Sequence, residues 1–411
     1  MDAKERQSKI LPILHEFIDS SVGLHAYIVI DSLRDGNSCG GLRISDDLTV
    51  EEIKALARGM TLKYCFLKLN TGGAKSGIIM QKNCTNEQRK KILEAFGRKA
   101  SSLLRKKTYV PWTDLNSSVN DISTIMNAAG CGFKGISDSA YFTALTVSSA
   151  VKAACESKGI DISTISVIIE GFGGVGMNIA SELSNWGAKI AGISTVKGAL
   201  FDSDGLNIDK LIELRKKYKD DLVYHYGAEC LERKELLLEM NTDVLIPCAR
   251  TWSINSMNMK NIKAKMIVPG ANAPLTEEAE EFFHKKGILY LPDFICNLGG
   301  VFGTSLYDNG NRKITVHRFI MNEFCQLVKE LIIKSIKENR LSFEIAKAVA
   351  EENCIAKDLG RQHKSWMKKF VIKVAHKDIH FQRFIPGLQA WDSLQNQRRI
   401  FAENIEIMKR L

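Results

Sequence analysis

The sequence predicts an α/β protein in which an N-terminal α/β domain precedes a doubly wound domain. Residues 164–170 are almost continuously apolar, which is the pattern of a parallel strand buried on both faces. A glycine-rich stretch follows that strand directly, and strand-like runs then alternate with helical patterns to about residue 310. Strand-like runs and helical patterns also occur before residue 138, so we expect a separate α/β domain there.

The N-terminal part is expected to contain helices at residues 4–20, 49–63 and 85–106, and strands at residues 25–31, 39–44, 66–69 and 109–114. We expect Asp46 or Asp47 to cap the second helix. Thr85 and Gln88 are three residues apart and predict a capping box for the third helix. The last strand ends on the carboxylate of Asp114.

The remainder is expected to contain helices at residues 139–157, 177–186 and 315–360, and strands at residues 164–170, 189–194, 244–247, 266–269 and 289–292. The alanine- and serine-rich helix at the start of this part is a natural bridge between domains. We therefore predict domains over residues 1–138 and 139–310. A C-terminal helical segment over residues 311–411 is expected to return partly to the first domain.

The composition is typical of a soluble globular protein, because 45% of the 411 residues are hydrophobic and 25% are charged. No run of about 18 apolar residues predicts a transmembrane helix, and the first residues lack the apolar core of a secretion signal. The ten cysteines occur singly, with no C-x-x-C pair, which argues against a zinc ribbon and a disulfide framework. We therefore expect a cytoplasmic protein with no membrane partner and no metal site.

The net charge of +10 invites a nucleic-acid hypothesis, but the charge is concentrated in the tail. Residues 357–411 hold twelve Lys/Arg and five Asp/Glu, so +7 of the total lies there. Aromatic residues are interleaved with these basic residues. We interpret the tail as a helical oligomer contact or a domain brace, and a nucleic-acid partner is not expected.

A glycine- and lysine-rich stretch at residues 69–78 is the first candidate for chemistry. Gly72 and Gly73 allow other backbone to come close, and Lys75 has only small neighbours. A lysine desolvated in a cleft loses basicity, and with a pKa of about 7–8 it works as a general base. The alternative is a turn that carries a solvated lysine.

A G-x-G-x-x-G motif formed by Gly171, Gly173 and Gly176 predicts dinucleotide binding in a Rossmann-type domain. The motif has the right context, because a buried strand precedes it and a helix and a second strand follow. The acid expected near residue 195 to hold the adenosine ribose is missing. Thr195 beside Lys197 would tolerate a 2′-phosphate, so both NAD and NADP are expected cofactors. The alternative is that these two residues only shape a loop.

Together, these motifs resemble the Glu/Leu/Phe/Val (amino-acid) dehydrogenase family over about residues 25–310. The matching strings are Gly40-Gly41-Leu42-Arg43, Ala57-Arg58-Gly59-Met60-Thr61-Leu62-Lys63, Gly72-Gly73-Ala74-Lys75-Ser76-Gly77, Val110-Pro111-Trp112-Thr113-Asp114, Lys197-Gly198-Ala199-Leu200-Phe201, Pro269-Gly270-Ala271-Asn272 and Asn297-Leu298-Gly299-Gly300-Val301. The resemblance implies an N-terminal domain for substrate binding and oligomerisation. It also implies reversible oxidative deamination of an L-amino acid to a 2-oxo acid and ammonia, in a homo-oligomer.

The resemblance also assigns roles to individual residues. Lys75 would be the base that activates water, and Asp114 would carry protons to and from the substrate nitrogen. Lys63 would bind the α-carboxylate. In the second domain, Asn297 would contact the substrate and the nicotinamide, Asn272 the cofactor ribose and Thr143 the nicotinamide amide. A solvated helix-end lysine and a strand-end cap are the structural alternatives for Lys63 and Asp114.

The departures from the family concern the substrate side chain. Glutamate-specific members have a lysine just before the Gly-Gly-Leu-Arg string, where this chain has the small, neutral Cys39. A second position that helps with the side-chain carboxylate falls on Thr304, which keeps a hydroxyl. Trp112 narrows the expected pocket. A neutral side chain is therefore favoured, unless another cation such as Arg43 supplies the missing charge.

The leading hypothesis is thus an NAD(P)-dependent amino-acid dehydrogenase for a neutral amino acid. The alternatives are glutamate dehydrogenase, and a catalytically weak relative that senses dinucleotide and acts through its basic tail.

Overall fold

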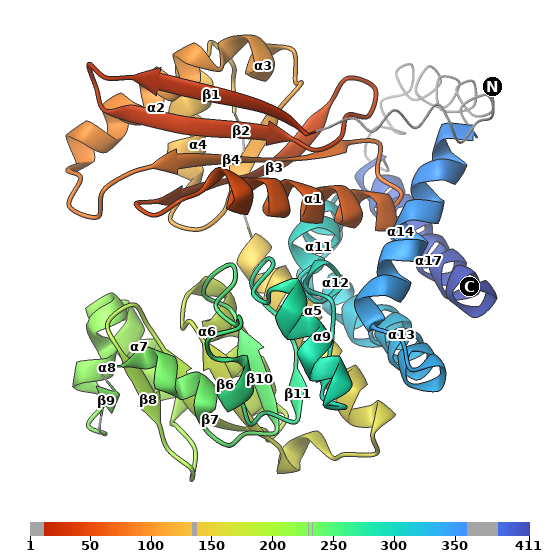
Figure 1. The fold of residues 1–411 in the computed structure, drawn as a ribbon. Helices are drawn as coiled ribbons and strands as arrows, with labels where there is room; N and C mark the ends of the chain where they lie inside the picture. Colours follow the sequence, from red (N-terminus) through yellow and green to blue (C-terminus); the bar gives the residue numbers. More distant parts are fainter. Residues whose placement is uncertain (1–11, 134–137, 229, 232, 360–384) are drawn as a thin grey trace. The chain divides into compact units, whose positions relative to one another are not determined.

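The computed structural model describes residues 12–133, 138–228, 230–231, 233–359 and 385–411. The chain divides into two compact units, Met1–Ser137 and Asp138–Leu411, each with its own sheet and helices (Figure 1). The expected α/β class, with a doubly wound second domain, is confirmed. Among the described residues, no helix is long and apolar enough to cross a membrane.

The first unit contains a five-stranded sheet with the order β1-β2-β4-β3-β5. The strands are β1 (Ile13–Asp19), β2 (Leu24–Ile30), β3 (Ser38–Ser45), β4 (Gly72–Ile79) and β5 (Val110–Thr113). β2 is antiparallel to both β1 and β4, whereas β3 is parallel to both β4 and β5. This order places Lys75 of β4 and the end of β5 on either side of β3.

Helices cover both faces of this sheet, and all of them except α3 begin at a residue whose side chain caps the first turn. They are α1 (Val50–Phe66), α2 (Asn86–Lys99), α3 (Ser101–Arg105) and α4 (Val119–Ala128). One core joins β2 and β4 to α2 and α4 through side chains such as Phe96 and Ile125, and a second joins β2 to α1 through Val29 and Ile53. The predicted capping box of Thr85 with Gln88 is present at the start of α2.

Three expectations for this unit are wrong. The described part of the expected helix at residues 4–20 is strand β1, because seven residues pair in register with β2 and this tertiary pairing overrides the local helical pattern. Residues 4–11 lie outside the described residues. Thr49 caps α1 in place of Asp46 or Asp47, since its side chain accepts the backbone N–H of Glu52.

The third error concerns the segment before Lys75. The expected strand at residues 66–69 does not form, because α1 continues to Phe66 and the chain then turns. The glycine- and lysine-rich stretch is itself strand β4 and not a loop. A Cβ on Gly73 would lie 2.1 Å from the backbone nitrogen of Thr61 in α1, so glycine at this position lets the helix lie against the strand.

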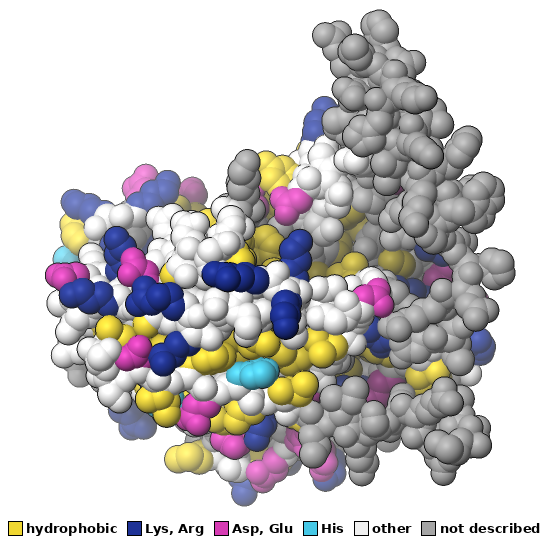
Figure 2. All heavy atoms as spheres, turned by 90° about the horizontal axis from the view of Figure 1, so that it is seen from above, with side chains coloured by type: hydrophobic (Ala, Val, Ile, Leu, Met, Phe, Trp, Pro, Cys, Tyr) yellow, Lys and Arg dark blue, Asp and Glu magenta, His cyan; other side chains and the backbone are white. Residues whose placement is uncertain are grey.

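β1 lies at one edge of the sheet and carries apolar side chains exposed to solvent. Ile13 and Leu14 are each 41% exposed and Ile18 is 55% exposed. Figure 2, which views the molecule from above, shows hydrophobic side chains gathered in a band beside Lys and Arg side chains. A strand edge with exposed apolar side chains is the type of surface that pairs with another chain.

The second unit contains a seven-stranded sheet with the order β12-β11-β10-β6-β7-β8-β9. The strands are β6 (Ser166–Glu170), β7 (Lys189–Ser194), β8 (Ala199–Phe201), β9 (Cys230–Leu231), β10 (Val244–Pro247), β11 (Met266–Ile267) and β12 (Leu289–Tyr290). The five predicted strands are all present and parallel, and the sequence did not predict β8 and β9, which are short and antiparallel. The chain order reverses between β6 and β10, where open α/β sheets bind their ligands.

The helices of this unit surround the sheet and continue into a C-terminal helical layer. They are α5 (Ser139–Ser157), α6 (Gly174–Asn185), α7 (Ile208–Tyr218), α8 (Leu222–His225), α9 (Glu277–Lys285), α10 (Asp293–Cys296), α11 (Gly299–Asp308), α12 (Lys313–Phe319), α13 (Cys325–Glu338), α14 (Ser342–Leu359) and α17 (Ile385–Arg410). α5 packs against α6, α11 and α13, and the continuous helix expected at residues 315–360 is interrupted by a π-helical turn at Ile320–Phe324 and a break before α14.

The described end of the tail belongs to this helical layer. Phe401 of α17 is 2% exposed and packs among Phe302, Phe319 and Phe324, with ring centroids 5.4–6.0 Å apart. The Arg398 side chain donates to Glu323 at 2.7 Å, so part of the positive charge of the tail is compensated within the unit. This packing favours the domain-brace interpretation for α17.

We expect F401A to lower the free energy of unfolding by about 3–5 kcal/mol, because it removes a fully buried ring from an aromatic cluster. Chemical denaturation monitored by circular dichroism measures this loss. W391A is the matched control, since Trp391 lies on the same helix but is 60% exposed. If W391A destabilises the protein as much as F401A does, α17 does not pack as described.

Candidate functional site

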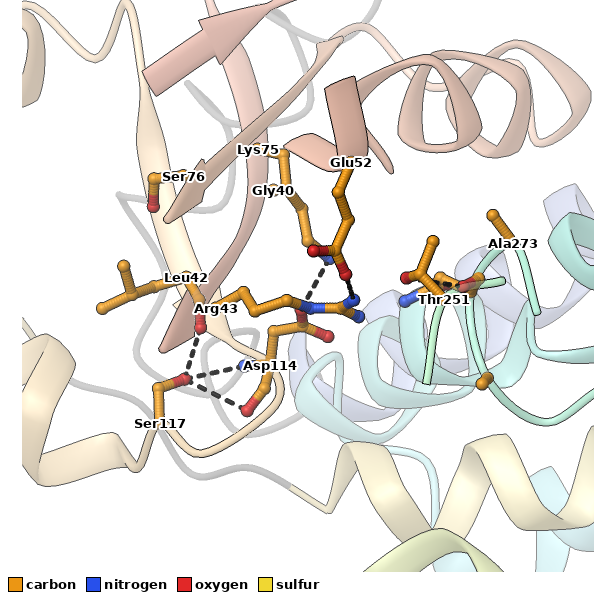
Figure 3. A network of polar contacts seen from close by, with 12 residues as sticks. Gly40, Leu42, Arg43, Glu52, Lys75, Ser76, Asp114, Ser117, Thr251 and Ala273 are labelled. Atoms are coloured by element: carbon orange, nitrogen blue, oxygen red, sulfur yellow. Dashed lines mark hydrogen bonds and ion pairs between the residues drawn. The ribbon is translucent and has the colours of Figure 1, made fainter. Parts of the chain in front are cut away.

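Lys75 is a buried cation in the middle of the first unit. It lies on β4, between β2 and β3, and only 2% of its surface is exposed. Its Nζ lies 3.1 Å from Oδ2 of Asp114, which follows the end of β5 (Figure 3). The two residues that the sequence predicted to act together are therefore in contact.

The loop that carries Asp114 is tied to β3. The backbone N–H of Asp114 donates to Oγ of Ser117 at 2.8 Å, and this hydroxyl donates to the carbonyl of Leu42 at 2.7 Å. A Cβ on Gly41 would lie 2.7 Å from Cβ of Asp114 and 3.3 Å from Nζ of Lys75. Glycine at position 41 thus allows the lysine and the carboxylate to approach each other over β3.

Arg43 and Glu52 extend this contact into a buried network (Figure 3). Nε of Arg43 donates to Oδ2 of Asp114 at 2.9 Å, and Nη1 donates to Oε1 of Glu52 at 2.6 Å. Arg43 and Glu52 are 4% and 8% exposed. From the sequence, we considered Arg43 only as a cation that replaces the lysine missing at position 39, and we did not identify Glu52 as a site residue. The signal that was available for this pair is an acid in the first turn of a helix that follows shortly after an arginine on a buried strand.

Burial and neighbouring charges shift the pKa values of both members of the central pair. Burial lowers the pKa of the Lys75 amine, the Asp114 carboxylate opposes this shift, and the Arg43 guanidinium adds to it. Burial alone would raise the pKa of Asp114, but Arg43 and Lys75 hold it well below its usual range. The cation that lowers the pKa of Lys75 in the structure is thus Arg43.

Beside this network, Cys39 lies near the Lys75 amine and the aromatic side chains of Tyr64 and Trp112. Burial raises the pKa of its thiol to about 11, so the thiol is uncharged at neutral pH, and Tyr64 and Trp112 interact with it. Trp112 packs edge-to-face on Phe133, with ring centroids 5.8 Å apart. Lys63, next to Tyr64 on α1, is 5% exposed.

In the second unit, the glycine turn has the geometry that a pyrophosphate requires. Gly171 has a φ of +94°, and a Cβ on Gly176 would lie 2.0 Å from the carbonyl oxygen of Gly171, so both glycines are required to close the turn. A Cβ on Gly173 would meet no atom within 4 Å, which means that the turn is open there. Gly173 also begins α6 without a side-chain cap, so backbone N–H groups of the first turn are available to an anion.

Asn297 and Asn272 come together at the carboxyl ends of the neighbouring strands. Nδ2 of Asn297 donates to the carbonyl of Ala271 at 2.9 Å and to Oδ1 of Asn272 at 3.1 Å. Oδ1 of Asn297 and Oγ1 of Thr304 are buried and have no hydrogen-bond partner within the described part of the chain. Buried polar atoms without a partner are costly. Oδ1 of Asn297 is suited to accept a hydrogen bond from a ligand, and the Thr304 hydroxyl is suited to donate or to accept one.

Two further predicted positions have different surroundings. Thr143, on α5, lies against α11, because a Cβ on Gly300 would be 2.7 Å from its Oγ1. The Thr195 hydroxyl donates to the carbonyl of Asp220 at 2.9 Å and accepts the backbone N–H of Lys197 at 3.1 Å. These bonds are those of the loop-shaping alternative, and the ribose contact of Thr195 stays a prediction.

The match to known families covers both units. Residues 135–350 match the model "Glutamate/Leucine/Phenylalanine/Valine dehydrogenase", and residues 17–130 match "Glu/Leu/Phe/Val dehydrogenase, dimerisation domain". The chain belongs to the Glu/Leu/Phe/Val dehydrogenase family. It is therefore an amino-acid dehydrogenase that uses NAD or NADP, as the resemblance implied.

Curated relatives of this dehydrogenase include a glutamate dehydrogenase of Thermotoga maritima, 29% identical over 67% of this chain and 70% of the relative. An NAD-specific glutamate dehydrogenase of Staphylococcus aureus is 33% identical over 65% of this chain and 67% of the relative. Among solved structures, a hetero-hexameric glutamate dehydrogenase of Thermus thermophilus has a TM-score of 0.70 at 20% identity, over 87% of this chain and 91% of that one. An L-tryptophan dehydrogenase of Nostoc punctiforme has a TM-score of 0.57 at 23% identity, over 85% of this chain and 97% of that one.

The residues of the second unit fit a dinucleotide. The open position at Gly173 accommodates a pyrophosphate, and the partnerless Oδ1 of Asn297 is available to a polar ligand. When bound, the cofactor supplies the hydride acceptor of the dehydrogenase.

Proposed function

We propose that this dehydrogenase catalyses the reversible oxidative deamination of an L-amino acid with a neutral side chain, giving the 2-oxo acid and ammonia. The observation that supports the reaction is the buried Lys75 amine, 3.1 Å from the Asp114 carboxylate. The observation that supports the neutral side chain is Cys39, which carries no charge at neutral pH where glutamate-specific members have a lysine.

The protein residues bind the amino acid and move protons. Lys63 binds the substrate α-carboxylate as a cation. The ionised Asp114 takes a proton from the substrate ammonium. A bound nicotinamide would supply the acceptor for the hydride that leaves the substrate Cα. Lys75, whose pKa is lowered by burial, takes in its unprotonated form a proton from the water that attacks the imino carbon. Asp114 returns its proton to the nitrogen. The C–N bond then breaks and ammonia departs, while the carbinol hydroxyl becomes the carbonyl of the 2-oxo acid and releases its proton to solvent.

The remaining roles follow the family resemblance. Asn297 and Thr304 contribute to substrate binding, and Asn297 also contacts the nicotinamide. Asn272 binds a cofactor ribose, Thr143 binds the nicotinamide amide, and the turn from Gly171 to Gly176 binds the pyrophosphate. Both NAD and NADP remain open, because the strand end at Thr195 lacks the acid that selects an unphosphorylated ribose.

The first experiment is a screen of the twenty L-amino acids, each with NAD and with NADP, that follows the absorbance of the reduced cofactor. We expect the highest kcat/KM with an amino acid whose side chain is neutral. Glutamate dehydrogenase is the second candidate, and the glutamate dehydrogenases among the relatives favour it. A highest kcat/KM with L-glutamate would replace the first candidate with the second. Turnover with none of the twenty would favour a dinucleotide-sensing relative.

C39K tests the choice of side chain directly. We expect kcat/KM for L-glutamate to rise at least about tenfold, because a charge-assisted hydrogen bond to the side-chain carboxylate contributes about 1.5–3 kcal/mol. Steady-state kinetics with L-glutamate and with the best neutral amino acid measure the change. C39S, which stays small and neutral, is the control and should leave the ratio unchanged. The same ratio for C39K and C39S would contradict the proposed role of position 39.

G41A tests the close approach of Lys75 and Asp114. The added methyl would lie 2.7 Å from Cβ of Asp114, so the carboxylate must move, and we expect kcat to fall at least about a hundredfold. G59A is the matched control: a Cβ there meets no atom within 4 Å and lies in helix α1. G59A should keep full turnover and gain about 0.5–1 kcal/mol of stability. Equal turnover of the two variants would show that position 41 does not control the pair.

The partner of the assembled enzyme is a second copy of this chain. The first unit matches a family model described as a dimerisation domain, and its edge strand β1 exposes Ile13, Leu14 and Ile18. A related enzyme from Thermus thermophilus is hetero-hexameric. Light scattering after size exclusion measures the mass, and a single-chain mass of 45.9 kDa would contradict a homo-oligomer.

A further inference from the structure

The carboxylate of Asp114 is fixed through only one of its two oxygens. Oδ2 accepts Nε of Arg43 at 2.9 Å and lies 3.1 Å from Nζ of Lys75. In the part of the chain that the structure describes, Oδ1 accepts no hydrogen bond. The two cations therefore orient the carboxylate, and the second oxygen is left to receive a proton (Figure 3).

Arg43 is itself held in place by α1. Its Nη1 donates to Oε1 of Glu52 at 2.6 Å, and the backbone N–H of Glu52 is fixed by Oγ1 of the cap residue Thr49 at 3.2 Å. The Arg43 side chain is 4% exposed and the Glu52 side chain 11%, so solvent screens this pair weakly. The network thus connects the start of α1, strand β3 and the loop after β5.

We infer that Arg43 and Glu52 are positioning residues of the reaction. They hold Oδ2 of Asp114 so that Oδ1 meets the substrate nitrogen. They also act on the Lys75 amine with opposite charges, because Arg43 is a cation and Glu52 is an anion. This inference rests on the proposed roles of Lys75 and Asp114. It assigns Arg43 to the carboxylate of the protein, whereas the sequence left open a contact with a carboxylate of the substrate.

The opposite signs follow from the charged groups around Lys75. Asp114 comes from the loop after β5, Arg43 from β3 and Glu52 from α1, and α1 also carries the buried Lys63. Arg43 lowers the pKa of the Lys75 amine, whereas Glu52 raises it. Loss of the guanidinium must therefore raise the pKa of Lys75, and loss of the Glu52 charge must lower it. Because Lys75 acts as a base only when it is neutral, the acid limb of kcat/KM follows the same shifts.

The experiment compares the pH dependence of kcat/KM for the wild type, R43M, E52Q and the double variant R43M/E52Q. The probe is the amino acid with the highest turnover in the screen, with saturating cofactor. We expect the acid limb to move up by about one pH unit in R43M and down in E52Q. The acid limb of the double variant should lie between those of the wild type and R43M, because Arg43 acts on the pKa of Lys75 more strongly than Glu52 does. E51Q is the control, since the Glu51 side chain is 73% exposed, and it should not move the limb.

A second measurement uses the enzyme without substrate. Acetic anhydride acetylates only unprotonated amines, so the pH dependence of Lys75 acetylation, followed by peptide mass spectrometry, reports the pKa of this amine in each variant. The same order of shifts is expected. If R43M does not fold because Glu52 is left without its partner, E52Q and the double variant still shift in opposite directions.

The results separate this inference from the proposed function. Full turnover of K75A would refute the proposed function itself. Loss of turnover in K75A, combined with shifts of the same sign in R43M and E52Q or with no shift in either, would overturn only the positioning role. Failure of Lys75 to acetylate at any pH would also overturn it, because the amine would be closed to small molecules. R43K keeps the charge and should keep the wild-type pH profile while kcat falls, since its ammonium lacks the two-pronged geometry that joins Asp114 to Glu52.

Discussion

K75A is expected to lower kcat about 10²–10⁴-fold and to leave the binding of reduced cofactor unchanged. Lys75 is a buried amine of the first unit, whereas the glycine turn that fits the dinucleotide belongs to the second. Removal of the amine leaves the attacking water without a base. Turnover is measured from the absorbance of reduced cofactor, and cofactor binding from a fluorescence titration with NADH or NADPH.

The matched control for this experiment is K82A. The Lys82 side chain is 88% exposed, and it pairs with the carboxylate of Asp46 at 3.4 Å. An exposed pair of this kind contributes about 0–1 kcal/mol, so K82A should keep both turnover and stability. Undiminished turnover in K75A would refute the base assigned here. Loss of cofactor binding together with turnover would show that K75A disturbs the fold and not only the chemistry.

The fold was predictable where local patterns and burial agree. The strands of the second unit are continuous apolar runs, and the glycine turn at the end of β6 has a steric reason that is visible in the sequence. The first unit was harder to predict. β1 is an edge strand whose pairing with β2 is a tertiary effect, and β4 contains Gly72 and Gly73, which usually indicate a turn. Gly73 lies directly against Thr61 of α1, whereas Gly72 lies against the backbone of Ser32, so both positions leave no room for a Cβ.

The site was predictable as a set of residues but not as a network. The sequence supplied Lys75 and Asp114 through motifs, and the structure places them in contact. It did not supply the pairing of Arg43 with Glu52, because a contact between a strand and a helix start nine residues later depends on the direction of both elements. The hydrogen bond from the Thr195 hydroxyl to the carbonyl of Asp220 depends on packing in the same way, and the ribose contact of Thr195 stays a prediction.

D114N is expected to lower kcat by a similar factor of about 10²–10⁴, for a different reason. An amide has nearly the same shape as the carboxylate but cannot accept the substrate proton. It also leaves the Arg43 guanidinium and the Lys75 amine without their shared counter-charge. The pKa of Lys75 should therefore fall, because the Asp114 carboxylate raises it in the wild type. Turnover and the acetylation of Lys75 as a function of pH measure the two effects separately.

The pH dependence of the stability of D114N tests the contacts of Asp114 independently of turnover. The folded enzyme depresses the pKa of Asp114 well below its unfolded value of about 3.9. A carboxylate of this kind stabilises the fold above that value and loses its contribution as the pH falls towards the folded pKa. The melting temperature of D114N should therefore lie below that of the wild type at neutral pH, and the difference should shrink below about pH 4.

D121N separates this chemistry from a purely structural role. Asp121 is also a carboxylate with a lowered pKa, but it caps α4 through Ser118 and pairs with Arg89 at 3.0 Å, away from Lys75. We expect D121N to lose stability with an acid dependence of the same sign and to retain its kcat. If D121N loses as much turnover as D114N, the loss in D114N reflects unfolding. If D114N retains turnover, the proton must reach the substrate nitrogen through another group, and Asp114 is then only the counter-ion of Lys75.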